Sequence, residues 1–150
     1  MRCATLVTWL VVAAAACGGE RPGETTRAAG DMTELTVLVA AAKASYLAGE
    51  PITLTLGVKN PTDLAVTLRF ATGQRYDFVI ESAAGVEVWR WSADRVFTQA
   101  LGEQTVPPGW ELDYNETFAG RLAPGTYRVR GIVPSVGDTL EAWGELVVRQ

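Results

Sequence analysis

The sequence predicts an all-β protein, a sandwich of about seven or eight antiparallel strands. Apolar and polar residues alternate along most of the chain after residue 33, which is typical of strands with one buried face. Turn signals rich in glycine and proline separate most of these stretches, and no series of helical patterns alternates with them. A sandwich is therefore favoured over a parallel α/β sheet.

The expected strands can be placed in order along the chain. Residues 52–58 alternate aliphatic side chains with threonine and glycine, an Asn-Pro-Thr-Asp turn follows at 60–63, and the alternation resumes in residues 64–70. The full set of expected strands is 34–40, 52–58, 64–70, 76–81, 86–91, 110–118, 126–133 and 140–149. Residues 94–101 have apolar side chains at helical spacing, so we expect at most one or two helical turns there.

The most distinctive run covers residues 70–101, where two alternating segments join through a short Ala-Ala-Gly turn. Trp89 and Trp91 alternate with their neighbours and so share one face of a strand. Two interpretations stay open. The two indole rings pack beneath the segment 92–109, or they form a surface for a peptide or a sugar, since tryptophan is enriched at binding hot spots.

Composition excludes several classes of function. The chain has 150 residues, which suits one domain, and 13 basic against 17 acidic side chains, which is a poor balance for a nucleic-acid-binding protein. It has no histidine, so it lacks the general base of a Ser-His-Asp or Cys-His site and the imidazole ligands of common zinc and copper sites. We therefore expect no enzyme, no metal and no cofactor.

Two carboxylates, Asp77 and Glu81, lie on one face of an expected strand, where an acid and nucleophile pair could form. Four residues of strand separate them by roughly 13 Å, which is beyond the ~5 to 9.5 Å used in glycoside hydrolysis. We expect them to be solvated side chains rather than catalysts.

The amino-terminal part of the chain predicts export. Residues 1–16 read as a signal peptide, and the sequence Ala-Ala-Ala-Cys ending at Cys17 resembles the lipobox of bacterial lipoprotein precursors, although its first alanine replaces the usual leucine. Residues 17–32 then form the lipidated cysteine and a flexible tether, and 33–150 the folded domain. We expect a cell-envelope protein held on a bacterial membrane by a lipid anchor at Cys17. The alternative is a plain secretory signal and a secreted or periplasmic domain.

Five short motifs occur in a fixed order between about residues 35 and 135. They are Gly-Gln-x-Tyr-Asp-Phe at 73–78, Val-Trp-x-Trp-Ser at 88–92, Phe-x-Gln-Ala-Leu at 97–101, Pro-Gly at 108–109 and Pro-Gly-x-Tyr at 124–127. This combination resembles the BsuPI-type intracellular proteinase inhibitor domain. The resemblance implies an immunoglobulin-like β-sandwich and a protein partner, a serine protease. It carries over no reactive-site residues. Within the motifs we expect Gly73 to adopt a positive φ and Tyr76 and Phe78 to face the core.

Three functions remain compatible with the sequence. The first is a non-enzymatic envelope lipoprotein that binds a protein and inhibits a serine protease through an exposed loop within 92–109. The second is a structural or assembly module of an envelope complex, and the third is a carbohydrate-binding domain. The candidate partner-binding residues are Trp89, Trp91, Ser92, Arg95, Phe97, Gln99 and Trp110.

Overall fold

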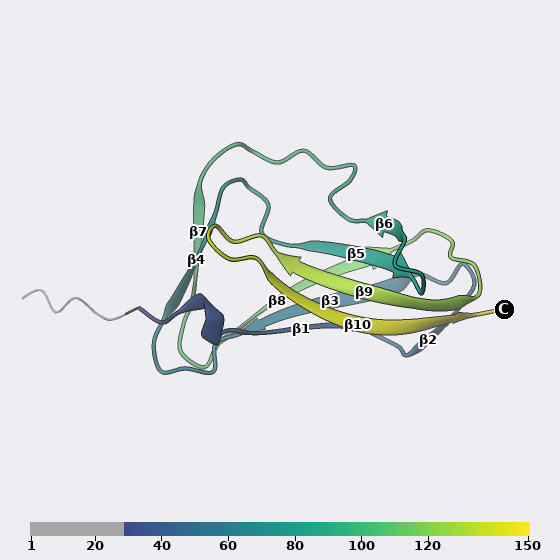
Figure 1. Cartoon of the computed structure of the whole chain (residues 1–150), viewed down its shortest axis with the longest axis horizontal. Coiled ribbons are helices and arrows are strands. Elements are labelled where there is room, and N and C mark those ends of the chain that lie inside the picture. Colours follow the sequence, from purple (N-terminus) through teal and green to yellow (C-terminus); the bar gives the residue numbers. More distant parts are fainter. Residues whose placement is uncertain (1–28) are drawn as a thin grey trace, which may run out of the picture.

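The computed structural model describes residues 29–150. The predicted signal peptide, Cys17 and most of the predicted tether lie outside the described residues. A 3-10 helix, η1 (Met32–Glu34), is followed by ten strands (Figure 1). The strands are β1 (Thr36–Ala41), β2 (Ser45–Leu47), β3 (Ile52–Lys59), β4 (Val66–Phe70), β5 (Asp77–Ser82), β6 (Glu87–Arg90), β7 (Gly102–Val106), β8 (Glu111–Phe118), β9 (Gly125–Val133) and β10 (Leu140–Arg149).

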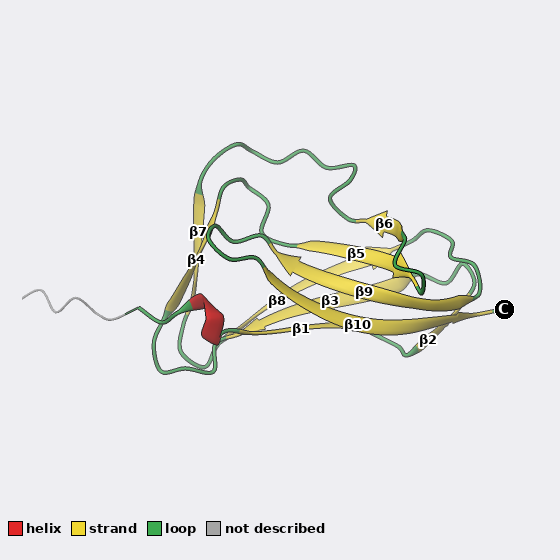
Figure 2. Cartoon of the chain, in the orientation of Figure 1, coloured by secondary structure: helices red, strands yellow, loops and turns green. Residues whose placement is uncertain are grey.

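The strands form three sheets, which confirms the predicted all-β sandwich. One sheet has the order β1-β3-β8, a second has the order β2-β10-β9-β5-β6, and β4 pairs with β7 in a third. The first two sheets lie one over the other, and the β4-β7 pair lies at one end of the molecule (Figure 2). All pairs are antiparallel except β2 with β10, which is parallel because β2 continues the direction of β1 after a short bend. This parallel pair is the one exception among the described strands in the predicted antiparallel sandwich.

The core follows from the period-two alternation of the strands that face each other. In β3 the alternating side chains Ile52, Leu54, Leu56 and Val58 are almost fully buried, as the sequence pattern predicts. They meet apolar side chains of the five-stranded sheet, in a core that includes Phe78, Ile80, Val129 and Leu146. Burying one such side chain contributes about 1.5–3 kcal/mol, so this layer provides most of the force that holds the two sheets together.

Strand β5 is buried along both faces, and this corrects the expectation that its two carboxylates are solvated. Asp77 is 3% exposed and Glu81 is 8% exposed. Asp77 pairs with Arg90, and Glu81 pairs with Arg128 and Arg130, whose guanidinium groups cover the outer side of the strand. A carboxylate can be buried here because a charged donor takes the place of water.

Residues 94–101 contain no helix. A turn covers 91–94, and an irregular stretch then leads directly into β7. The apolar residues at helical spacing share no buried face, because Val96 is 99% and Leu101 is 86% exposed. No helix within residues 29–150 has the length and apolar character needed to cross a membrane.

Candidate functional site

The β6–β7 loop (residues 91–101) is the longest connection between strands in the described part of the chain. It joins the edge of the five-stranded sheet to the β4-β7 pair and arches away from the body of the molecule (Figure 1). The side chains of Val96 and Leu101 stand almost fully in solvent. Exposed apolar side chains on a loop that is held in place are typical of an interaction surface.

The first turn of the loop is fixed by the buried carboxylate of Asp77. Its Oδ1 accepts hydrogen bonds from the backbone N–H of Phe78 (2.9 Å) and of Ser92 (3.1 Å). Its Oδ2 accepts from the Ser92 hydroxyl (2.6 Å) and from Nη1 of Arg90 (3.0 Å). The N–H of Arg95 then donates to the carbonyl of Ser92 (3.1 Å), which closes the turn. Asp77 is therefore an anchor for the loop rather than a catalytic group.

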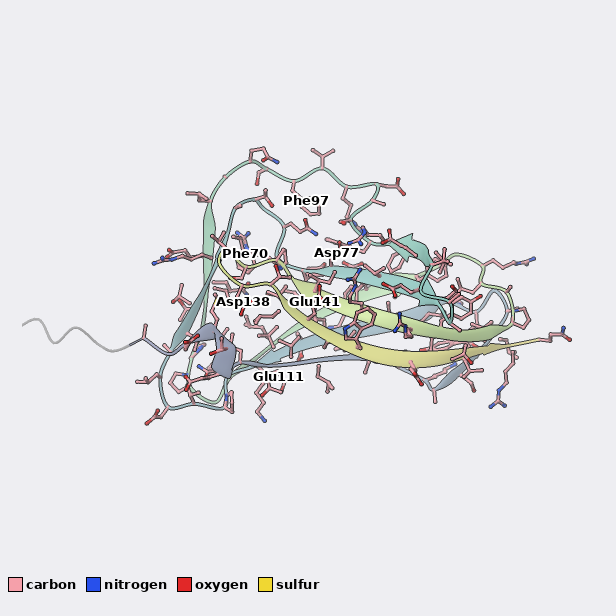
Figure 3. All side chains as sticks on the ribbon, in the orientation of Figure 1. Phe70, Asp77, Phe97, Glu111, Asp138 and Glu141 are labelled. Atoms are coloured by element: carbon pink, nitrogen blue, oxygen red, sulfur yellow. The ribbon has the colours of Figure 1, made fainter. Side chains whose placement is uncertain are left out.

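An aromatic stack supports the loop from below. The ring centroids of Tyr114, on β8, and Tyr76 are 4.5 Å apart, with an interplanar angle of 22°. Those of Tyr76 and Trp91 are also 4.5 Å apart, with an angle of 30°. Phe97 adds to this stack from above, with its ring centroid 5.8 Å from that of Trp91. In Figure 3 Phe97 points from the loop toward the body of the molecule. Each aromatic pair contributes about 0.5–1.5 kcal/mol beyond its buried area, so the loop rests on a firm base.

Arg95 is held against the same stack. Its guanidinium lies 4.1 Å from the centroid of the Trp91 ring, and its Nε donates to the Trp91 carbonyl at 3.2 Å. Its Nη2 is 3.9 Å from Glu116, which also accepts a hydrogen bond from the Tyr76 hydroxyl at 2.5 Å. The pair with Glu116 is half-exposed and contributes little, whereas the contact with the indole sets the direction of the side chain.

Two tyrosines of the stack have perturbed acidities. Burial, together with the hydrogen bond to Glu116, raises the pKa of Tyr76 to about 12. Burial also raises the pKa of Tyr114, whose hydroxyl donates to Gln104 at 2.8 Å. Both hydroxyl groups therefore stay protonated near neutral pH.

The far part of the loop is tied to the connection before β5. The N–H of Gly73 donates to the carbonyl of Thr98 at 2.8 Å. Gly73 has no positive φ, so that expectation is wrong. A Cβ at this position would lie 2.5 Å from Oγ1 of Thr98, so close approach of the loop is what requires a glycine here.

The structure gathers four of the seven candidate residues. Trp91, Ser92, Arg95 and Phe97 form the base of the loop, as the contacts above show. Trp89 is half-buried and packs against Phe118, with the ring centroids 5.1 Å apart. Of the two tryptophans of the motif, only Trp91 therefore lies beneath the loop. Gln99 is exposed and donates to the Phe97 carbonyl at 3.4 Å. Trp110 is 64% exposed but lies in the turn after β7, where its carbonyl accepts from the N–H of Asn60.

Val96, Tyr114 and the anchoring role of Asp77 were missed from the sequence. No spacing rule relates Tyr114 to Tyr76 or Asp77 to Ser92. The first contact depends on how the two sheets face each other, and the second on how β5 pairs with β6. One signal in the sequence could have indicated Val96. It is an aliphatic residue between Arg95 and Phe97, whose side chains can both pack on an indole.

An apolar hollow adjoins the end of the loop. It measures about 210 Å³ and is lined by Arg69, Phe70, Leu101, Gly102, Glu103 and Val136. Ligand pockets for small molecules usually measure ~300–1,000 Å³, so a protein side chain is a better fit than a cofactor. Among residues 29–150 no three Cys, Asp or Glu side chains come together as a metal site.

Comparison with known proteins gives one family and several structures of similar fold. Residues 39–137 match the family model BsuPI, described as an intracellular proteinase inhibitor. No match to this chain was found among curated proteins.

Three solved structures are similar to parts of this chain, and two of them, with TM-scores of 0.51 and 0.50, show the likeness of fold. Spo0M, a sporulation control protein of Bacillus subtilis, is 18% identical with a TM-score of 0.51, over 78% of this chain and 50% of that protein. The C-terminal domain of wzt is 9% identical with a TM-score of 0.50, over 78% of this chain and 74% of that domain. The DNA glycosylase AlkC of Pseudomonas fluorescens is 16% identical with a TM-score of 0.48, over 78% of this chain and 31% of that enzyme. The chain thus spans half or less of Spo0M and AlkC, and at these identities the likeness concerns the fold alone.

Proposed function

Because the chain belongs to the BsuPI family of intracellular proteinase inhibitors, we propose that its sandwich binds a protease and blocks it with the β6–β7 loop. One observation carries this proposal. Val96 is 99% exposed, yet both neighbouring side chains are fixed on Trp91. The loop therefore offers a side chain to a partner without being free to move away.

This arrangement suits inhibition because it lowers the entropic cost of binding. Ordering a flexible loop costs about 0.5–1.5 kcal/mol for each side chain that is immobilised at an interface. Here Asp77 fixes the first turn, Trp91 holds the middle, and Gly73 holds Thr98. Much of that cost is met when the domain folds, so more of the contact energy is available for affinity.

We further propose that the target is a serine protease outside the cytoplasm, and that the domain itself is not an enzyme. The predicted signal peptide at 1–16 and the lipobox-like sequence before Cys17 support an exported protein with a lipid anchor. Several acyl chains at Cys17 would hold it stably at the membrane. Labelling of cells with a radioactive fatty acid tests the anchor: the full chain should incorporate label and Cys17→Ala should not. Equal labelling of both would contradict lipidation at this residue.

The inhibitory function can be tested by titration of the purified protein against a panel of serine proteases. We expect loss of protease activity at one inhibitor per enzyme and a complex that survives gel filtration. Val96→Asp should weaken inhibition, whereas Leu38→Asp, at an exposed apolar site on β1, serves as the matched control. Cleavage of the protein as an ordinary substrate, with no retained complex, would rule out the proposal.

The other functions compatible with the sequence receive less support. The ring of Trp91 is in contact with Tyr76 and Arg95, and Trp89 packs on Phe118. Of the three tryptophans proposed for a sugar-binding surface, only Trp110 is then left. For an assembly module, crosslinking in cells should recover stable partners that are not proteases.

A further inference from the structure

Three consecutive residues of the β6–β7 loop are of types that proteases recognise, and only the middle one, Val96, has a side chain without contacts to the domain. Arg95, Val96 and Phe97 follow one another, and they suit three different primary specificity pockets: an acidic one, a small one and a deep apolar slot. Which of the three the loop presents therefore indicates the kind of protease that it fits.

Arg95 and Phe97 are both committed to the domain. The guanidinium of Arg95 lies on the Trp91 ring and donates to the Trp91 carbonyl, and the ring of Phe97 packs against the same indole. Either side chain would have to give up these contacts before it could enter a pocket of another protein. Val96 has no such contacts to lose, since it is 99% exposed.

The backbone at Val96 is free as well. Among residues 29–150, no hydrogen bond is formed by the N–H or the carbonyl of Val96, although the adjacent turn and Thr98 are both tied down. An extended peptide in a binding cleft gains affinity from main-chain hydrogen bonds and specificity from side-chain pockets. Val96 offers both together.

Leu101 is the other large apolar side chain that is exposed on the loop, but its setting differs. It comes directly before Gly102, which is paired with Phe70 in the β4-β7 sheet. Its side chain borders the apolar hollow next to Phe70. Leu101 is therefore suited to a contact at the side of the protease rather than to the primary pocket.

We infer that Val96 is the residue that enters the primary specificity pocket, and that the target is a serine protease that prefers small branched aliphatic side chains. This inference rests on the proposed function and adds the class of partner to it.

Pancreatic elastase, chymotrypsin and trypsin are suitable probes, because their primary pockets accept small aliphatic, aromatic and basic side chains respectively. The wild-type protein should inhibit elastase at least about tenfold more strongly than the other two enzymes. Val96→Phe should shift the preference toward chymotrypsin, and Val96→Arg toward trypsin, each by about tenfold or more. Leu101→Ala is the control from the same loop and should leave the order of preference unchanged.

Each outcome decides between the inference and the function on which it rests. If the wild-type protein inhibits a protease but no substitution of Val96 changes the preference, the inference is overturned and the proposed inhibition stands. Stronger inhibition of trypsin than of elastase by the wild-type protein would also overturn it. If neither the wild-type protein nor any Val96 variant inhibits any of the three enzymes, the inference and the proposed inhibition both fail. Urea denaturation of each variant checks that folding is preserved, as expected for a side chain that contacts nothing.

Discussion

The single carboxylate of Asp77, on β5, binds both Arg90 of the edge strand β6 and Ser92 of the β6–β7 loop. Replacing it by asparagine keeps its size but removes the charge that Arg90 and Ser92 recognise. Breaking a buried ion pair leaves a partner without compensation, so we expect Asp77→Asn to lower the free energy of unfolding by about 3 kcal/mol. Urea denaturation followed by tryptophan fluorescence measures this change.

The matched control for this prediction is Asp94→Asn in the same turn. Asp94 is exposed and forms none of the ion pairs found in residues 29–150, so its substitution should change stability by less than about 0.5 kcal/mol. Similar losses in the two variants would show that the charge of Asp77 has no special part in fixing the loop.

Tyr76 makes the stability of the fold depend on alkaline pH. Its pKa is raised to about 12 from the usual 10.0, first by burial and then by its hydrogen bond to Glu116. The folded protein thus keeps a proton that the unfolded chain releases. This contribution to stability is complete below pH 10 and is lost as the pH rises toward 12.

An ultraviolet titration of tyrosinate checks this prediction. The wild-type protein should show a late ionisation that Tyr76→Phe lacks, and its urea midpoint should fall more steeply above pH 10 than that of the variant. A late ionisation that persists unchanged in Tyr76→Phe would assign it to Tyr114 alone, whose pKa is also raised.

At the level of strands, the period-two pattern of the sequence predicted eight of the ten strands. In β4, β8 and β10 the structure shows the same alternation in side-chain burial. The two exceptions are β2, with only three residues, and β7, whose sequence Gly-Glu-Gln-Thr-Val carries one fully buried side chain, Val106. Short strands with little apolar content are formed by their partners, here β10 and β4. Local sequence contains no information about such pairings.

The candidate loop shows the same division between local and tertiary information. The sequence indicated the region after β6 as a binding segment, and Trp91 and Phe97 as aromatic residues within it. It allowed at most one or two helical turns there, because spacing alone cannot show that Phe97 packs on an indole while Val96 is exposed to solvent. Which side chain is offered to a partner depended on contacts made by the folded sheets.

The connection before β5 and the β6–β7 loop meet at Gly73 and Thr98, and their fit can be tested. In Gly73→Ala the new Cβ would lie 2.5 Å from Oγ1 of Thr98, so the Thr98 side chain or one of the two segments must shift. We expect a loss of about 1–3 kcal/mol in the free energy of unfolding and weaker protease inhibition. Chemical denaturation and inhibitor titration measure the two effects.

A second substitution tests whether that contact is the cause. Thr98→Ala removes Oγ1 and leaves only ordinary or slightly tight contacts to the new Cβ. The double variant Gly73→Ala/Thr98→Ala should therefore recover most of the lost stability. If the double variant is as unstable as the sum of the two single variants, the close approach is not what requires glycine.

At the scale of the whole molecule, the family match and the folded unit have different limits. The match covers residues 39–137, which excludes β10. Yet β10 lies inside the five-stranded sheet, between β2 and β9, and its side chains Ala142, Leu146 and Val148 belong to the core. The residues that match the family model are therefore fewer than those that the folded sandwich needs, because the sandwich also requires β10.

A chain that ends at residue 137 should consequently fail to fold, even though it contains the complete family match. It would lose three buried side chains, of which Leu146 and Val148 contribute about 1.5–3 kcal/mol each, and it would leave β9 with an unpaired edge. A domain of this size is stable by only about 5–15 kcal/mol, so we expect no cooperative urea transition and strong aggregation. Removal of Gln150 alone, an exposed residue beyond β10, is the control and should leave the transition unchanged. A cooperative transition in the chain ending at 137 would mean that β2 and β9 can close the sheet without β10.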